Sequence, residues 1–107
     1  YNMEITPREF SSMVMLVRDA LLEMKKVLDY TGDVAANYMK MEARCRKIYV
    51  FEERGDEFYR EEIRRLFTEK QSAAYMIYWK DILVDVERML DAAAGAATLL
   101  QKLFVRV

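Results

Sequence analysis

The chain has 107 residues, 53% of them hydrophobic and 33% charged, with three Gly, one Pro and a formal net charge of -1. Its length allows one domain with a modest core, and its composition is too apolar for a disordered chain and too poor in turn formers for a many-stranded β protein. The near-neutral charge gives no electrostatic reason to expect nucleic acid, and no polybasic run is present to anchor the chain on a membrane. We therefore expect a single all-α domain over residues 1–107, built from a few long helices.

No apolar run approaches the roughly 18–20 residues that a helix needs to cross a bilayer, and no signal peptide is recognisable. Cys45 is the only cysteine and falls on an apolar helix face. This placement favours a small buried hydrophobe in a reducing compartment over a reactive thiol. We expect no membrane insertion and a cytoplasmic location, at most peripheral to the inner membrane.

The first predicted helix spans about residues 7–30. Thr6 is its expected N-cap, Pro7 its first helical residue, and Glu9 the residue that closes a capping box. Its expected buried face recurs at helical spacing and consists of Phe10, Met13, Val14, Val17, Leu21, Met24, Val27 and Leu28. The opposite, solvated side consists of Arg8, Ser12, Arg18, Asp19, Glu23 and Lys26.

A turn over residues 31–33, with Asp33 as N-cap, leads into a second helix from about Val34 to Glu69. At a rise of about 1.5 Å per residue, this helix is roughly 50 Å long. Gly55 in its interior costs about 1 kcal/mol against Ala, so we expect either a bend or the close approach of another segment there. Its apolar stripe consists of Val34, Tyr38, Met41, Cys45, Ile48, Tyr59, Ile63 and Leu66.

Residues 70–72 form the next connection, and Ser72 is the expected N-cap of a third helix from about Ala73 to Phe104. Three helices joined by short turns run up, down and up, so we predict an up-down-up three-helix bundle with long second and third helices. The small residues at 92–97 allow another helix to approach closely. Parts of the long helices project past the first one, and the apolar run at 75–79 adds to them, so we expect self-association or a missing part of the same chain there.

Three arginines of the second helix, Arg60, Arg64 and Arg65, are expected on its solvated face. Their expected partners at helical spacing are Glu57, Glu61 and Glu62. Exposed pairs of this kind contribute little to stability, so we attach no function to them.

The apolar stripe of the second helix, continued through its middle, falls on Glu52 and Gly55. A carboxylate at a buried position needs a partner, because an isolated buried charge is very costly. Asp56 lies one turn after Glu52, and Glu87 and Asp91 repeat the same spacing in the third helix. Clustered carboxylates offer the hard oxygen ligands that Mg, Ca, Mn or iron bind, so these four residues are the candidate metal ligands.

An interpretation without metal stays open, because acidic residues one turn apart are common on solvated helix faces. In that case the four carboxylates are surface charges, and Glu52 pairs with a nearby cation. The candidate cations are Arg44, Arg46, Arg54 and Lys80.

The chain has no histidine. This removes Ser-His and Cys-His nucleophilic systems, His-containing zinc sites and di-iron bundles that need Glu-x-x-His motifs. A glycine-rich phosphate loop is also missing from the sequence. We therefore expect no enzymatic activity; a metal-dependent hydrolase of phosphate esters is the less favoured catalytic interpretation.

Several segments carry a resemblance that runs in order over about residues 5–107. The segment 48–58 contains a hydrophobic-Glu-x-x-(small)-Asp motif, and Leu66-Phe67 follows at the end of the second predicted helix. The segments 78–83, 86–91 and 96–107 are similar to Lys-Trp-Lys-(acidic)-Ile-Tyr, Leu-Glu-x-x-Thr-Asp and an Ala-Asn…Ile-Val-Lys ending. Together they resemble the PhoU-like family, in particular the phosphate-transport accessory proteins associated with low-affinity, Pit-type transporters.

The resemblance implies one three-helix repeat of a protein normally built from two, so the chain is expected to be a fragment of a longer protein or to dimerise. It implies a non-enzymatic regulator or accessory of inorganic phosphate transport that docks on a transporter or its signalling partners. It also implies a metal, iron or another divalent ion, bound by the ligands Glu52, Asp56, Glu87 and Asp91.

Two positions depart from the family pattern. The family commonly has a further acidic residue one turn after the second motif, where this chain has Gly95. Arg54 places a positive charge inside the first motif. The alternative function is a generic helical protein-protein interaction module without metal.

Overall fold

The computed structural model of the chain describes residues 7–105, and every regular element in this range is helical. The elements are α1 (Phe10–Asp29), the short 3-10 helix η1 (Tyr30–Asp33), α2 (Val34–Thr68) and α3 (Ala73–Phe104). The predicted all-α class is confirmed. The helix count differs from the three predicted, because η1 joins α1 to α2 without a non-helical residue, which leaves two uninterrupted helical runs of 59 and 32 residues packed together.

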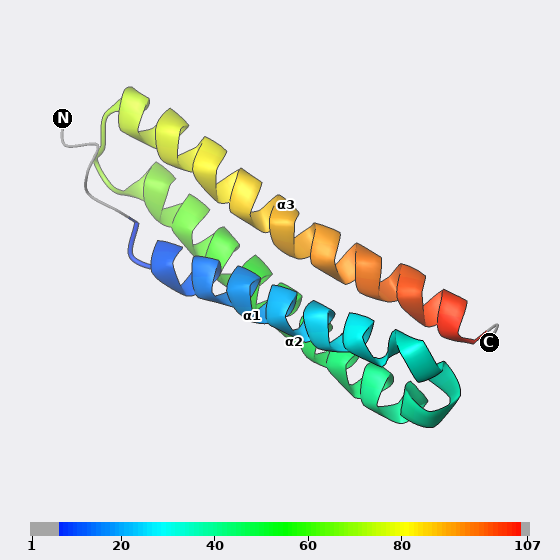
Figure 1. Cartoon of the computed structure of the whole chain (residues 1–107). Coiled ribbons are helices and arrows are strands. Elements are labelled where there is room, and N and C mark those ends of the chain that lie inside the picture. Colours follow the sequence, from blue (N-terminus) through cyan, green and yellow to red (C-terminus); the bar gives the residue numbers. More distant parts are fainter. Residues whose placement is uncertain (1–6, 106–107) are drawn as a thin grey trace.

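The first helical run folds back on itself at η1, so that α1 and α2 lie side by side (Figure 1). After residues 69–72 the chain reverses again, and α3 runs in the same direction as α1. The result is an elongated rod with extents of 55 × 19 × 16 Å. None of the described helices is both long enough and apolar enough to cross a membrane.

Two predicted N-caps are confirmed. The Asp33 side chain accepts a hydrogen bond from the Ala36 N–H at 3.1 Å, and the Ser72 hydroxyl accepts one from the Tyr75 N–H at 3.0 Å. Each satisfies one of the backbone donors that a helix start leaves without a partner. α3 has the predicted bounds, and α2 ends one residue before its predicted end.

The start of α1 differs from the prediction. The first residue of α1 is Phe10 rather than Pro7, and the Phe10 N–H donates to the Pro7 carbonyl at 3.1 Å in a turn before the helix. The Glu9 N–H, which a capping box would pair with the side chain of the N-cap residue, donates to Glu62 of α2 at 2.9 Å. The predicted N-cap Thr6 lies outside the described residues. The Glu9 N–H is therefore satisfied by a contact with a distant helix.

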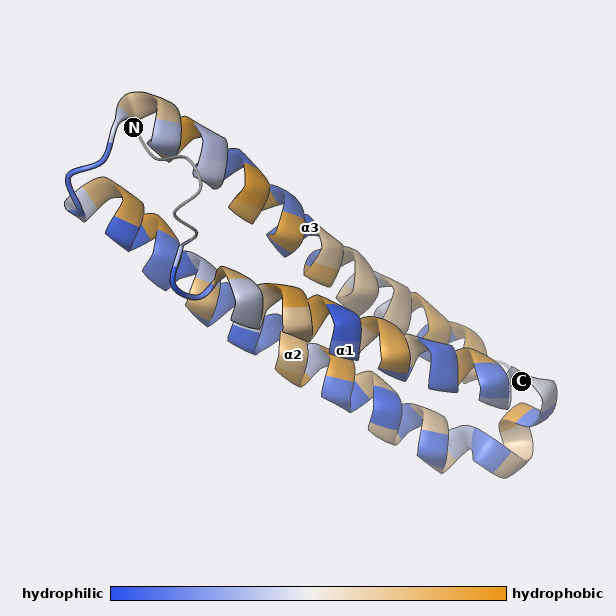
Figure 2. Cartoon of the chain, turned by 60° about the vertical axis from the view of Figure 1, so that its left-hand side comes forward, coloured by the Kyte–Doolittle hydropathy of each residue, from blue (hydrophilic) through white to orange (hydrophobic). Residues whose placement is uncertain are grey.

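The core forms where α1, α2 and α3 meet. Figure 2 shows hydrophobic and hydrophilic residues alternating along α1, as a helix with one buried face requires. The predicted stripe of α1 was placed too far to one side. Leu16 and Ala20 are buried, whereas Val14, Leu21 and Leu28 are exposed. The fully buried large side chains, other than Glu62, are Met13, Val27, Met41, Cys45, Ile48, Leu83 and Leu90.

Glu23 of α1 was predicted on the solvated side but is buried. Its carboxylate pairs with Arg44 of α2 at 3.2 Å and with Lys26 at 3.6 Å. The pair with Arg44 links α1 to α2. Periodicity could not reveal this, because the pattern of α1 alone does not show which flank faces α2.

The two interior glycines behave differently. A Cβ atom on Gly55 would lie 2.2 Å from Leu90 Cδ1, so the predicted close approach at Gly55 is confirmed and α3 supplies it. Gly95 has no such neighbour within 4 Å. In the run of small residues at 92–97, the buried members are Ala93 and Ala97. Only the side of that run formed by Ala93 and Ala97 is therefore buried, so the expected close approach of another helix is limited to that side.

Candidate metal centre

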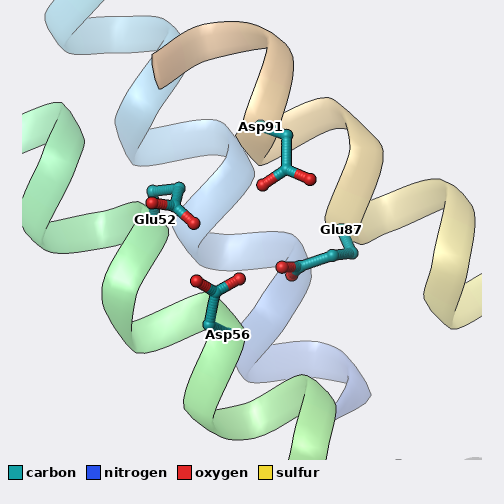
Figure 3. A group of neighbouring side chains, drawn as sticks. All are labelled: Glu52, Asp56, Glu87 and Asp91. Atoms are coloured by element: carbon teal, nitrogen blue, oxygen red, sulfur yellow. The ribbon is translucent and has the colours of Figure 1, made fainter. Parts of the chain in front are cut away.

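Four carboxylates converge between the middle of α2 and the middle of α3 (Figure 3). Glu52 and Asp56 extend from one face of α2, and Glu87 and Asp91 extend from the facing side of α3. One oxygen from each side chain can be chosen so that all four lie within 4.8 Å of one another. The predicted convergence of the two pairs is confirmed.

The close contact at Gly55 explains why the two pairs meet. Gly55 lies between Glu52 and Asp56 in the sequence, and its missing side chain leaves room for Leu90, which lies between Glu87 and Asp91. Each helix therefore contacts the other at the centre of its own acidic pair. A larger residue at position 55 would separate the helices at the point where the carboxylates face one another.

The cluster lies at the edge of the helix interface. Glu52, Asp56 and Glu87 are partly buried, and Asp91 is exposed to solvent. The Oε2 atom of Glu87 is buried without a hydrogen-bond partner among the described residues. A buried acceptor without a partner is unfavourable, which makes this oxygen the point at which a proton or a cation would stabilise the site most.

Within residues 7–105, no Lys or Arg forms an ion pair with any of the four carboxylates. Of the four cations considered as partners of Glu52, Arg44 pairs with Glu23 instead, and Arg46, Arg54 and Lys80 form no ion pair with Glu52 among the described residues. Arg60 acts on the cluster only through its charge, which helps to lower the pKa of Asp56. The predicted alternative, in which a cation of the chain neutralises Glu52, is therefore absent from this part of the structure.

Mutual repulsion and burial separate the pKa values within the cluster. Burial raises the pKa of Glu87 to about 8, and its hydrogen bond with Asp56 and the Asp56 charge add to the increase. The hydrogen bond with Asp56 raises the pKa of Glu52 to about 7, with burial second. The pKa of Asp56 is lowered, chiefly by its hydrogen bond with Glu87. In the absence of metal, the arrangement fits an ionised Asp56 between two neighbours that hold protons.

These ligands suit a hard divalent cation. Four carboxylates bring up to four negative charges and only oxygen donors, which Mg²⁺, Ca²⁺, Mn²⁺ and iron accept. Gly95, one turn after Asp91, is exposed and has no side chain to add a fifth ligand. Arg54 is exposed on α2 and makes no ion pair with the cluster.

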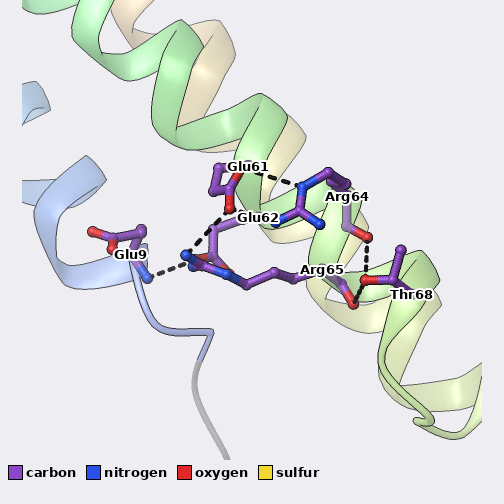
Figure 4. Close-up of polar contacts among 6 residues, drawn as sticks. All are labelled: Glu9, Glu61, Glu62, Arg64, Arg65 and Thr68. Carbon is purple, nitrogen blue, oxygen red and sulfur yellow. Dashed lines mark hydrogen bonds and ion pairs between the residues drawn. The ribbon is translucent and has the colours of Figure 1, made fainter.

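Besides Glu23, the sequence missed a second acidic residue of structural importance, Glu62. It was expected on a solvated face but is 2% exposed, and it accepts hydrogen bonds from Arg65 and from the Glu9 N–H (Figure 4). The predicted pairing of the arginines is confirmed for Arg64, which binds Glu61 at 2.6 Å, and for Arg65. Nothing local in the sequence distinguishes Glu62 from Glu61, because its burial depends on the segment before α1.

No family model, curated protein or solved structure matches this chain. Its resemblance to PhoU-like proteins therefore depends on the motifs in the sequence alone.

Proposed function

We propose that this chain is a non-enzymatic regulator or accessory of inorganic phosphate transport, related to one up-down-up three-helix repeat of the PhoU-like proteins. In this proposal the chain docks on a phosphate transporter or its signalling partners. Glu52, Asp56, Glu87 and Asp91 hold iron or another divalent metal that stabilises the docking-competent form. The observation that carries the proposal is the convergence of these four carboxylates without a cation of the chain among them.

Two kinds of observation support the proposal. The acidic pairs that resemble the family motifs face one another across α2 and α3, as a shared metal site requires. The end of the α2–α3 hairpin exposes Phe67, Ile77 and Tyr78, and an apolar cleft of about 220 Å³ lies between Phe67 and Ile77. Such a surface fits contact with another protein.

Metal binding can be tested directly with protein purified without chelators. We expect divalent metal to be retained and, after its removal, Mn²⁺ or Fe²⁺ to bind again in calorimetric titration. The double variant Glu52→Gln/Asp56→Asn should lose this binding. The matched control is Glu53→Gln/Glu57→Gln, which removes two exposed carboxylates with the same spacing from the same helix.

The transport role needs a separate measurement. Phosphate uptake by cells that express a low-affinity phosphate transporter should change when the chain is co-expressed, and the Glu52→Gln/Asp56→Asn variant should lose the effect. An unchanged uptake with a metal-loaded protein would reject the transport role while leaving the metal site in place.

A helical interaction module without metal is the second candidate, and one observation favours it. The raised pKa values of Glu52 and Glu87 show that protons can relieve the repulsion within the cluster. A metal-free protein that keeps its partner after the double substitution would establish this alternative.

A further inference from the structure

The exposed apolar residues of α1 lie on two sides of the helix: Val14, Leu21 and Leu28 on one, and Met15 and Leu22 about 100° further round. Val14, Leu21 and Leu28 are 43–55% exposed and stand seven residues apart, which is close to two helical turns, so they lie on one side. Glu23, which binds Arg44 of α2, lies two residues after Leu21 and so about 200° further round the helix. The apolar stripe of α1 therefore lies on the flank that faces away from α2.

A second stripe of exposed apolar residues follows α3. Met89, Leu99 and Leu103 are 46–60% exposed, and Ala92 and Ala96 complete steps of three and four between them. The α2-facing flank of α3 is marked by Gln101, which accepts a hydrogen bond from Tyr49 of α2. Gln101 lies two residues after Leu99, about 200° further round, so this stripe also faces away from α2.

The two stripes form one surface. α1 and α3 run in the same direction (Figures 1 and 2). They are in contact where the Phe10 and Trp79 rings meet, with centroids 5.1 Å apart. Since both stripes avoid α2 and flank the contact between α1 and α3, they lie side by side. We define this α1–α3 face by Val14, Leu21, Leu28, Met89, Leu99 and Leu103.

We propose that a second copy of this chain docks on the α1–α3 face, with the two-fold axis parallel to the helices. Monomeric proteins rarely expose large contiguous apolar surfaces, and six large apolar side chains are exposed on this face. The molecule is 55 Å long and 19 Å wide, so one long side can supply the roughly 800 Å² per partner that a stable dimer buries. Paired α1–α3 faces would form a four-helix core.

The charges on the α1–α3 face determine how the second copy is oriented. Arg18 and Lys25 occupy exposed positions between the apolar residues of α1, where they form surface ion pairs with Asp19 and Asp29. Asp81 and Asp85 precede Met89 on α3, and Asp85 pairs with Arg88 at the surface. Surface pairs of this kind contribute little to stability, so they can be exchanged for pairs with a second copy. A parallel two-fold axis places α1 of one copy over α3 of the other, so that basic and acidic positions meet. An antiparallel arrangement would place α1 over α1 and bring like charges together.

The heights of the charges agree with this orientation. Phe10 contacts Trp79, which puts these two residues at one level along the rod. Arg18 lies about 12 Å beyond Phe10, and Asp85 lies about 9 Å beyond Trp79 in the same direction. A two-fold axis parallel to the helices preserves these levels, so Arg18 of each copy can exchange its surface pair with Asp19 for Asp85 of the other copy, which gives up Arg88.

The oligomeric state provides the first test. Sedimentation at tens of micromolar should give a dimer for the wild-type chain and a monomer for Leu21→Glu. The control is Met39→Glu, which charges an exposed apolar position on α2 outside the face and should leave the dimer intact. Circular dichroism checks that both variants stay helical. A wild-type monomer, or equal dissociation by both variants, overturns the proposal and leaves the face to a different protein.

Disulfide trapping provides the second test and distinguishes the parallel from the antiparallel arrangement of the two copies. Protein with Leu21→Cys, mixed with protein with Met89→Cys, should form a covalent heterodimer under mild oxidation, since Cys45 is buried and does not compete. Leu21→Cys alone should not cross-link to itself. Self-cross-linking of Leu21→Cys would indicate the antiparallel arrangement and refute the proposed dimer.

Exchanging the charges at positions 18 and 85 provides the third test. Arg18→Glu and Asp85→Lys should each weaken the dimer several-fold, and the two together should restore it, because the opposite charges meet again. Additive weakening would rule out the pairing of Arg18 with Asp85. Neither residue belongs to the carboxylate cluster, so these outcomes are independent of metal binding.

Discussion

Glu62 and Glu87 both lie at helix interfaces, but among the described residues only Glu62 pairs with a cationic side chain. Glu62 is 2% exposed and accepts hydrogen bonds from Arg65 and the Glu9 N–H, so it joins the start of α1 to α2. Glu87 has a buried oxygen without a partner and faces three more carboxylates. The first site is complete within the chain, whereas the second needs protons or an external cation.

This difference separates structural acids from the candidate functional ones. A buried carboxylate that stabilises the fold has donors from its own chain, because an uncompensated buried charge costs several kcal/mol. Glu62 and Glu23 both meet that condition. The cluster between α2 and α3 does not, and its stability should therefore respond to pH and metal in ways that the Glu62 site does not.

Glu62→Ala should have the largest effect on stability. It leaves Arg65 without its buried partner and the Glu9 N–H without its acceptor, so we expect a loss of about 3 kcal/mol in the free energy of unfolding. Urea denaturation followed by circular dichroism measures this loss. Glu61→Ala is the control, since Glu61 pairs with Arg64 at the surface and its removal should change little. Equal effects of the two substitutions would contradict the assigned role of Glu62.

Gly55→Ala should have the second-largest effect on stability. Its methyl group would meet Leu90 Cδ1 at 2.2 Å, and Leu90 is fully buried and has little room to move. We expect a net loss of about 1–2 kcal/mol, because overpacking outweighs the gain of roughly 1 kcal/mol in helix propensity. The substitution should also weaken metal binding by separating α2 from α3.

Gly95→Ala is the matched control for Gly55→Ala. Its added methyl group meets no neighbour within 4 Å, so only the gain in helix propensity remains. Gly95→Ala should therefore raise the unfolding midpoint while Gly55→Ala lowers it. A rise for both would mean that Leu90 gives way and that Gly55 does not set the helix spacing.

The free energy of unfolding of the metal-free protein should also depend on pH, with a total change smaller than the effect of Glu62→Ala. The pKa values of Glu52 and Glu87 are raised from 4.5 to about 7 and about 8 in the folded chain, so the folded state holds more protons than the unfolded one between about pH 4.5 and pH 8. The free energy of unfolding should therefore fall as pH rises through this window, by roughly 1–2 kcal/mol after allowance for solvent screening. The lowered pKa of Asp56 acts oppositely, but only below its ordinary value of 3.8.

Thermal unfolding at pH 5 and pH 9 measures this dependence. Glu52→Gln/Glu87→Gln should abolish most of the slope, and saturating Mn²⁺ should flatten it in the wild-type chain by replacing the protons. A slope that survives the double substitution would place its origin outside the cluster.

The sequence predicted the carboxylate cluster because local spacing carries the necessary information. The stripe of α2 falls on Glu52 and Gly55, and the helical repeat then places Asp56 beside them. By contrast, the burial of Glu62 depends on Glu9, 53 positions away in the chain. The periodicity of α1 also allows several faces, and only contact with Arg44 selects the one that buries Glu23. The helical pattern therefore predicted the meeting of the two acidic pairs, but it could not predict the contacts that bury Glu62 and Glu23.

Glu87→Gln should have the smallest effect on stability and the most informative sign. Glutamine resembles the protonated carboxyl and can donate to Asp56, so at pH 8 the metal-free variant should be more stable than the wild type by about 1 kcal/mol. Added Mn²⁺ should reverse the order, because a ligand stabilises only a folded state that binds it. The exposed Glu53→Gln should shift neither measurement. In a metal site, the repulsion that destabilises the metal-free protein also strengthens metal binding. A surface cluster that binds no metal would show the stabilisation by Glu87→Gln but no reversal by Mn²⁺.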